Sequence, residues 1–166
     1  PICAMLACPA HRLLLPQPEA SLPMPLVALI CALLVVATTL IHYEALRALN
    51  CGLPALRIAG RLKLVVVILV AFVAHAAEML LYAIAFYGLV VWLGAGELSG
   101  NTPFSFANCL YFSAETYTSL GFGDLAPVGA VRLLAGIEAL NGLLLIGWSA
   151  SFTYLAMERF WGPGSQ

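Results

Sequence analysis

Charged side chains are scarce in this sequence of 166 residues, making up 9% of it, whereas soluble domains carry about 25%. Apolar residues make up 63%, above the roughly 45–50% of soluble domains, which excludes a fold surrounded by water. Neither sign of charge dominates, since seven Lys and Arg stand against eight Asp and Glu. This balance excludes a basic face for nucleic acid and an acidic solvating tail.

Paired cysteines are also missing from the sequence. The five cysteines are odd in number, are scattered and form no C-x-x-C pair. Their spacing excludes a disulfide framework and a cysteine zinc site. We interpret all five as packing residues in or beside apolar segments: Cys3, Cys8, Cys31, Cys51 and Cys109.

Long apolar runs, by contrast, are abundant. Residues 24–49, 61–93 and 131–161 each exceed the roughly 18 residues that mark a bilayer-spanning helix. The segment 50–60 separates the first two, because its glycines and Pro54 interrupt a helix. The sequence therefore predicts an all-α membrane protein with three transmembrane helices.

Basic residues mark one side of the predicted membrane. Most of them flank the segment 50–60, and another ends the third helix. Because basic residues favour the cytoplasmic side, we expect a cytoplasmic C-terminus and an extracytoplasmic N-terminal arm, residues 1–23. We predict a multi-pass protein of the cell's inner (plasma) membrane. The five of the seven basic residues on which this orientation rests are Arg47, Arg57, Arg61, Lys63 and Arg159.

The segment 94–128, between the second and third helices, is too broken by glycine, proline and polar residues to span a membrane. It nevertheless carries an aromatic run at residues 104–117, which is typical of a re-entrant segment. Irregular backbone survives at membrane depth only when it is buried in protein or lines an aqueous path. We therefore expect the functional site here.

Residues 111–128, YFSAETYTSLGFGDLAPV, resemble the pore helix and selectivity filter of potassium channels. The core of the match is TSLGFGD at residues 118–124, where family filters usually have TVGYGD. Glu115 falls where small bacterial channels carry a carboxylate behind the filter, and Pro127 follows at the family's spacing. The resemblance implies a re-entrant pore helix and filter loop in a tetrameric pore-loop channel, which is not an enzyme and needs no cofactor.

The same residues fit the physics of cation selection. A filter replaces the hydration shell of an ion with backbone carbonyls, and successive carbonyls face one axis only if the backbone alternates in handedness. Gly121 and Gly123 can adopt the positive φ that this alternation needs. The C-terminal end of the preceding helix would place partial negative charge near the ion. The predicted K⁺ ligands are the carbonyls of Ser119, Leu120, Gly121 and Phe122, with the Ser119 hydroxyl completing the innermost site.

One filter strand cannot surround an ion, so this chain, with one motif, is expected to form a homotetramer. Its expected partners are K⁺, which is the permeant ion, three further copies and membrane lipid, with no nucleic acid. The resemblance divides the chain as follows: peripheral helix and cytoplasmic loop 24–60, pore module 61–161 and C-terminal tail 162–166. Within the module lie the outer helix 61–93, turret 94–105, pore helix 106–118, filter 119–124 and inner helix 131–161.

Some residues depart from the usual filter. Phe122 lacks the hydroxyl of the usual tyrosine, Leu120 replaces a stiffer valine, and Tyr111 and Phe112 stand where tryptophans are common. We therefore expect a looser outer filter, and a nonselective monovalent cation channel is the alternative. The predicted filter is Thr118, Ser119, Leu120, Gly121, Phe122, Gly123 and Asp124, supported by Glu115, Tyr111 and Phe112. Glu115 and Asp124 are expected to share a proton.

The predicted inner helix carries Gly142 and Gly147, where the family's helix can bend. Glycine in a membrane helix also serves close packing, so both explanations stay open for Gly142, and packing is favoured for Gly147. In the same register an apolar stripe would line the central cavity: Leu143, Ile146, Ala150 and Tyr154.

Four polar residues within the predicted spans suggest an intramembrane polar cluster: His75, Glu78, Glu138 and Asn141. At 1.5 Å per residue, His75 and Glu78 lie about 18–23 Å above Lys63 and Glu138 about 31 Å above Arg159, so the sequence leaves open whether they meet. His42 and Glu44 are expected to extend toward the cytoplasmic headgroups. A remote alternative is a membrane metal enzyme or metal transporter that uses these histidines and glutamates, although no H-E-x-x-H spacing is present.

Overall fold

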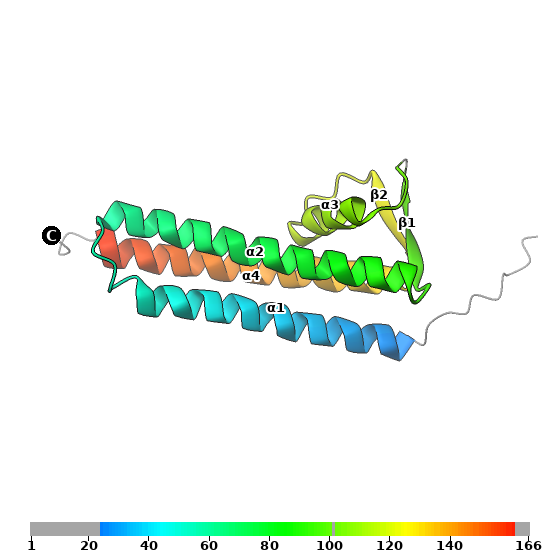
Figure 1. Cartoon of the computed structure of the whole chain (residues 1–166), viewed down its shortest axis with the longest axis horizontal. Helices are drawn as coiled ribbons and strands as arrows, with labels where there is room; N and C mark the ends of the chain where they lie inside the picture. Colours follow the sequence, from blue (N-terminus) through cyan, green and yellow to red (C-terminus); the bar gives the residue numbers. More distant parts are fainter. Residues whose placement is uncertain (1–23, 101, 162–166) are drawn as a thin grey trace, which may run out of the picture.

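A computed structural model of the chain describes residues 24–100 and 102–161. Three long helices lie side by side: α1 (Met24–Gly52), α2 (Gly60–Val91) and α4 (Val131–Trp161), with α2 antiparallel to the other two (Figure 1). Each is long and apolar enough to cross a membrane, which confirms the predicted all-α membrane fold. The predicted arm 1–23 and tail 162–166 lie outside the described residues.

A short helix and a small sheet sit together beside one end of the bundle, where α2 ends and α4 begins (Figure 1). The helix is α3 (Phe106–Tyr117), and the strands are β1 (Gly96–Gly100) and β2 (Leu125–Gly129). The strands pair antiparallel, with Leu98 opposite Pro127. They therefore hold the two ends of the re-entrant segment together.

The sequence did not predict these strands, because the segment 94–105 was expected to be an irregular turret. Both strands contain glycine and one contains proline, and neither shows the alternation typical of a strand. Pro127 is tolerated because each strand of a two-stranded sheet has an unpaired edge. The strands pair because α2, which precedes β1, and α4, which follows β2, pack against each other. The hydrogen bond from Ala130 N to Ala95 O (2.8 Å) joins the same two chain segments just outside the sheet.

The three long helices share a core near the end that carries α3. Val27 and Cys31 of α1, Phe86 of α2 and Leu134 of α4 are fully buried there. Helix α1 contacts both α2 and α4, so it is an integral member of the bundle. Cys31 and Cys109 are buried as predicted for packing residues, whereas Cys51 is exposed.

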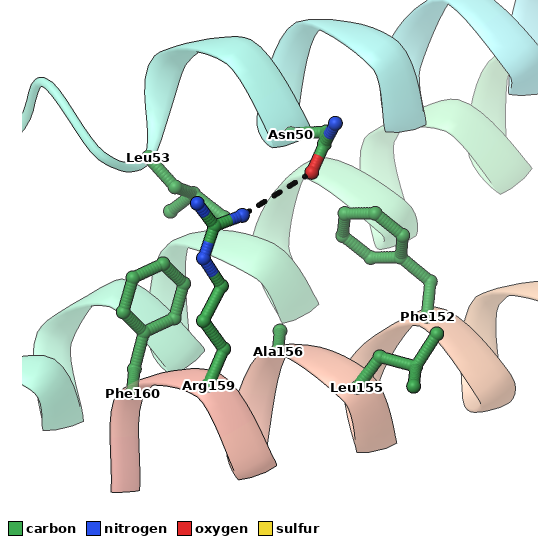
Figure 2. Close-up of a pocket in the computed structure, with 7 residues that line it drawn as sticks. All are labelled: Asn50, Leu53, Phe152, Leu155, Ala156, Arg159 and Phe160. Carbon is green, nitrogen blue, oxygen red and sulfur yellow. Dashed lines mark hydrogen bonds between the residues drawn. The ribbon is translucent and has the colours of Figure 1, made fainter. Parts of the chain in front are cut away.

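The opposite end of the bundle is closed by α1, α2 and α4. A Cβ on Gly60 would lie 2.6 Å from the Phe160 carbonyl oxygen, so glycine permits a close approach of α2 to α4. Figure 2 shows Arg159 pointing from α4 toward α1, where its Nη1 donates to Asn50 Oδ1 at 3.5 Å. A small apolar cavity lies beside this bond, lined by Asn50, Leu53, Phe152, Leu155, Ala156, Arg159 and Phe160.

Candidate functional site

Helix α3 begins with a side-chain cap. Ser105 has an extended backbone, and its Oγ accepts a hydrogen bond from Asn108 N at 3.2 Å. Serine in this position satisfies one of the backbone N–H groups left free at a helix N-terminus. The cap therefore fixes the residue at which α3 begins. The length of α3 then determines where the loop 118–124 begins.

The loop after α3 folds back on the carbonyl end of the helix. Ser119 N donates to Thr116 O at 3.0 Å, and Leu120 N donates to Glu115 O at 2.8 Å. These bonds satisfy carbonyls that have no partner inside the helix. The loop is therefore fixed directly to the end of α3 that carries partial negative charge.

Backbone handedness alternates along this loop. Ser119, Gly121 and Gly123 have φ of 57°, 55° and 80°, whereas the intervening Leu120 and Phe122 do not have positive φ. A Cβ on either glycine would meet no atom within 4 Å, so conformation rather than space favours glycine there. Positive φ at Ser119 was not predicted, since serine seldom adopts it.

Side chains of α3 support the outer part of the loop. Glu115 is buried, and its Oε2 accepts a bond from Phe122 N at 3.1 Å. The Tyr111 ring stacks on the Phe122 ring, with centroids 6.4 Å apart and planes 6° apart. Stacking thus supports a ring that has no hydroxyl of its own. Phe112 faces the other way and meets Phe86 of α2 edge-on at 5.1 Å.

The two carboxylates near the loop bind different donors. Asp124 Oδ1 accepts from the Tyr111 hydroxyl at 3.3 Å and from Leu125 N at 3.1 Å, while Glu115 holds Phe122 N. No hydrogen bond joins the two carboxylates within residues 24–100 and 102–161, so the structure does not place a shared proton between them. Burial, together with the negative charge of Asp124, raises the pKa of Glu115 above its usual value.

The inner helix α4 contacts the end of α3 at a glycine. A Cβ on Gly142 would collide with the carbonyl oxygen of Tyr117 and lie 2.9 Å from its ring carbon Cγ. Gly142 is thus a close-packing residue, the explanation that the sequence left open beside a hinge. A Cβ on Gly147 would meet no atom within 4 Å of the described chain, which gives the favoured packing explanation no support there.

The sequence profile of a family described as an ion channel matches residues 62–159, which is more than half of the chain. The chain belongs to this ion-channel family. The match includes α3, the loop 118–124 and nearly all of α2 and α4, but not α1. From here on we call residues 118–124 the filter loop, after the role that the sequence predicts for them.

A curated relative of this channel is the inward rectifier potassium channel Kirbac3.1 of Paramagnetospirillum magnetotacticum. The two are 33% identical over 72 residues, which cover 42% of this chain and 24% of the relative. The chain therefore spans about a quarter of the length of that protein. Together with the family match, this similarity confirms the predicted resemblance to potassium-channel pore modules. No solved structure matches the chain.

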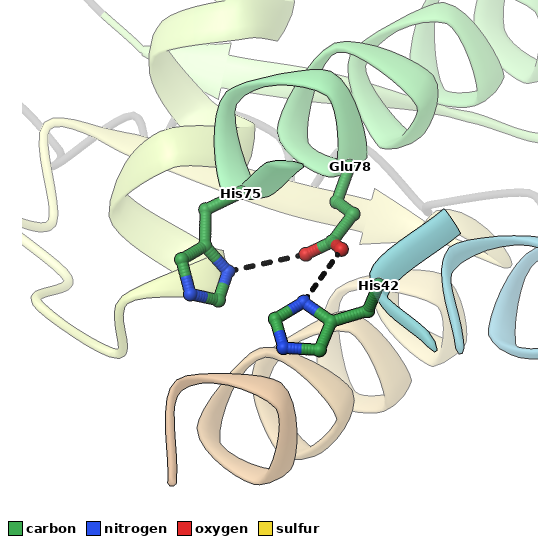
Figure 3. Close-up of side chains that lie close together, drawn as sticks. All are labelled: His42, His75 and Glu78. Carbon is green, nitrogen blue, oxygen red and sulfur yellow. Dashed lines mark hydrogen bonds and ion pairs between the residues drawn. The ribbon is translucent and has the colours of Figure 1, made fainter. Parts of the chain in front are cut away.

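The channel also contains a closed ring of polar side chains from α1, α2 and α4. Figure 3 shows His42 and His75 pointing at Glu78, with 3.0 Å between His42 Nδ1 and Glu78 Oε1 and 3.2 Å between His75 Nδ1 and Glu78 Oε2. Ser149 Oγ closes the ring, 3.2 Å from His42 Nε2 and 3.1 Å from His75 Nε2. We call these four residues the polar ring.

The proton count of the polar ring follows from its bonds. Each of its four bonds needs one hydrogen, and the Ser149 hydroxyl supplies one of them. The two imidazoles and the carboxyl group of Glu78 supply the other three, which is the number that they carry when their total charge is zero. The ring can therefore be fully hydrogen-bonded and neutral, as burial among apolar helices requires.

The polar ring also touches the end of α3. The Tyr117 hydroxyl donates to Glu78 Oε2 and lies 2.9 Å from His75 Nδ1. Tyr117 is the last residue of α3 and immediately precedes the filter loop. The ring thus joins α1 and α4 to the residue on which the filter loop is built.

The prediction for His42 on α1 was wrong. The sequence suggested that His42 reaches toward cytoplasmic headgroups, but its side chain is fully buried against Glu78. Hydropathy gives the depth of a residue along a helix but not the direction in which it faces. A usable signal was present, because Thr38 and His42 lie one helical turn apart on the same face of a largely apolar helix. Glu44 does remain exposed, paired with Arg47.

The other two members of the predicted polar cluster lie in separate hydrogen-bonded groups. Asn141 Nδ2 donates to Thr38 Oγ1 at 2.8 Å and to the Tyr82 hydroxyl at 3.1 Å, joining α4 to α1 and α2. Glu138 instead bonds the Ser113 hydroxyl of α3, and its Oε2 has no hydrogen-bond partner within the described chain. Of the predicted cluster, only His75 and Glu78 contact each other directly.

The predicted cavity-lining residues share one property. All four are exposed on α4 in the single chain: Leu143, Ile146, Ala150 and Tyr154. Their role in a cavity stays a prediction, because it depends on further copies of the chain.

Proposed function

We propose that this ion channel is a homotetrameric potassium channel in which the filter loop of each chain contributes one quarter of a backbone-carbonyl filter. Ser119, Leu120, Gly121 and Phe122 would supply the carbonyls that bind the permeant K⁺, and the Ser119 hydroxyl would complete the innermost site. The channel would conduct passively, without catalysis and without a cofactor.

The observation that carries the proposal is the alternating handedness of the filter loop. Positive φ recurs at Ser119, Gly121 and Gly123, and this alternation allows successive carbonyls to face one line. The loop also begins at the carbonyl end of α3, where the helix dipole favours a cation. Backbone carbonyls provide oxygen ligands without any titratable group. Such neutral oxygen ligands suit a hard monovalent cation.

Exposed apolar side chains support an assembly of several copies. Leu120 and Phe122, which belong to the filter loop itself, are 60% and 67% exposed in the single chain. Large apolar side chains around such a site mark a surface that a further chain covers. One filter loop cannot enclose an ion, and a closed ring with fourfold symmetry would give each loop the same environment.

The orientation in the membrane is part of the proposal. We propose an inner (plasma) membrane protein with the filter loop on the outer side and the end that contains Arg159 in the cytoplasm. Arg47, Arg57, Arg61 and Lys63 lie at that same end of the bundle, which supports this orientation by the positive-inside rule.

The proposal is tested by reconstituting the purified channel in a planar bilayer with K⁺ on one side and Na⁺ on the other. A reversal potential close to the potassium equilibrium potential is expected. A value near zero with robust current would replace it with a nonselective cation channel. No current from a chain that forms an intact tetramer would contradict both.

A further inference from the structure

We propose that His42, His75 and Glu78 form a binding site for a divalent transition-metal ion of the zinc class, which links α1 to the pore module. The conduction path proposed above does not include these three side chains, and the inference does not depend on the proposed potassium selectivity. Two imidazoles with one carboxylate are a donor set that zinc accepts in proteins, with a fourth position left for water or a hydroxyl group.

The ligand atoms are already close enough for one ion to reach all three residues. One donor atom from each residue can be chosen so that all lie within 4.8 Å of one another. Tetrahedral bonds of about 2.0–2.1 Å place neighbouring ligand atoms about 3.3–3.4 Å apart. His42 Nδ1 lies 3.0 Å from Glu78 Oε1, and His75 Nδ1 lies 3.2 Å from Glu78 Oε2, so each imidazole is within a few tenths of an ångström of that separation from one oxygen of the carboxylate.

The polar ring also supplies the outer contacts that metal sites need. A histidine ligand usually donates its second ring N–H to an acceptor, which fixes the orientation of the ring. Both Nε2 atoms lie beside Ser149 Oγ, at 3.1 and 3.2 Å, while both Nδ1 atoms face Glu78. An oxygen with two lone pairs can accept from both imidazoles at once. When Ser149 accepts from both Nε2–H groups, the lone pairs of both Nδ1 atoms face Glu78.

The proton count of the three side chains is compatible with the positive charge of a metal ion. The neutral ring holds three protons on the two imidazoles and Glu78. With a metal ion bound at both Nδ1 atoms, the imidazoles keep one proton each on Nε2 and the third proton is released. The Tyr117 hydroxyl bonds Glu78 and lies 2.9 Å from His75 Nδ1, so it is within reach as a fourth ligand.

The burial of the three side chains gives the direction of entry. The His42 and Glu78 side chains are 0% exposed, whereas that of His75 is 16% exposed. An ion therefore enters past His75 and lies between α1 and α2, beneath Tyr117. Binding should hold α1 more firmly against the rest of the bundle.

The test is a Co²⁺ titration of the full-length channel in lipid nanodiscs at neutral pH, after treatment with a chelator. We expect one Co²⁺ per chain, the visible absorption of tetrahedral Co²⁺ and displacement by Zn²⁺. X-ray absorption of the Zn²⁺ form should show nitrogen and oxygen ligands without sulfur. The absence of stoichiometric binding by the wild-type channel would overturn the proposal, and so would sulfur ligation.

Matched variants identify the ligands. His42→Gln and His75→Gln should each weaken Co²⁺ binding about tenfold or more, and Ser149→Ala should weaken it by about ten- to hundredfold. His11→Gln, which removes the third histidine, and Glu44→Gln, which removes an exposed carboxylate of α1, should leave it unchanged. Unchanged binding in both His42→Gln and His75→Gln would also overturn the proposal. The wild-type titration decides the matter if a variant fails to assemble.

Discussion

The filter loop and the polar ring are both polar regions of an apolar molecule, but they are built from different parts of the chain. The filter loop uses consecutive residues, and its conformation depends on the backbone of Ser119, Gly121 and Gly123. The polar ring uses side chains from three helices, and Ser149 lies 107 residues after His42. One region is therefore sensitive to local conformation, and the other to the packing of whole helices.

Tyr117 is the residue where the two regions meet. Its hydroxyl bonds Glu78 of the polar ring, and its backbone touches Gly142 and leads into the filter loop. Substitutions in the filter loop should therefore report on backbone conformation, and substitutions in the polar ring should report on helix packing.

The largest effect is expected from Gly123→Ala in the filter loop. Alanine at a φ of 80° costs about 1–2 kcal/mol in each copy, although a Cβ there meets no atom. We expect K⁺ conduction to be lost while the tetramer persists, as measured by bilayer currents and by size-exclusion chromatography. Gly52→Ala, at a helix end with open space, is the control and should conduct normally. Normal K⁺ currents from Gly123→Ala would contradict the filter assignment.

In the polar ring, Glu78→Ala should produce the largest loss of stability. It removes the shared partner of His42, His75 and Tyr117, and breaking a buried pair costs about 3–5 kcal/mol. We expect a lower thermal unfolding temperature in the presence of a chelator. Glu44→Ala removes only an exposed pair with Arg47 and should change little. Equal effects of the two variants would remove the distinction between buried and exposed carboxylates.

A smaller loss is expected where α4 meets α3. Gly142→Ala places a methyl group against the Tyr117 carbonyl, and such overpacking costs about 1–3 kcal/mol. Because Tyr117 leads into the filter loop, single-channel conductance should fall together with thermal stability. Gly147→Ala adds the same methyl group where no atom lies within 4 Å. If both variants behave alike, Gly142 has no special contact with α3.

The smallest effect concerns the charge of Glu115. Its pKa is raised by burial and by Asp124, so the folded state binds the proton more tightly than the unfolded chain does. The resulting stabilisation is present at acid pH and disappears as pH rises through the raised pKa. Glu115→Gln keeps an acceptor for Phe122 N but has no titration. The unfolding temperature of wild type relative to this variant should therefore decrease from about pH 4 to about pH 8. A constant difference would contradict the shifted pKa.

The positive φ of Gly121 and Gly123 in the filter loop could be predicted from sequence because the information for it is local. Two glycines with one residue between them, after an aromatic helix, indicate a backbone that needs positive φ. The third such residue, Ser119, could not be found in this way, since serine does not require that conformation. Its positive φ follows from the bonds that hold the loop to the end of α3.

The polar ring could be found only in part. His75 and Glu78 lie one turn apart on one helix, so their contact was predictable. The participation of His42 and Ser149 depends on how α1 and α4 are rotated about their axes, and composition does not encode that rotation. The same reason explains why Glu138 and Asn141, close in sequence on one helix, bond to different neighbours.

The spacing of bonded residues along the chain has a consequence for biosynthesis. Thr38 and His42 are made early, whereas their partners Asn141 and Ser149 follow 103 and 107 residues later. When α1 enters the bilayer, its polar groups have no partner on α4, because α4 has not been synthesised. Their final hydrogen bonds form only after the last helix is inserted, so completion of the bundle is a late event in the life of each chain.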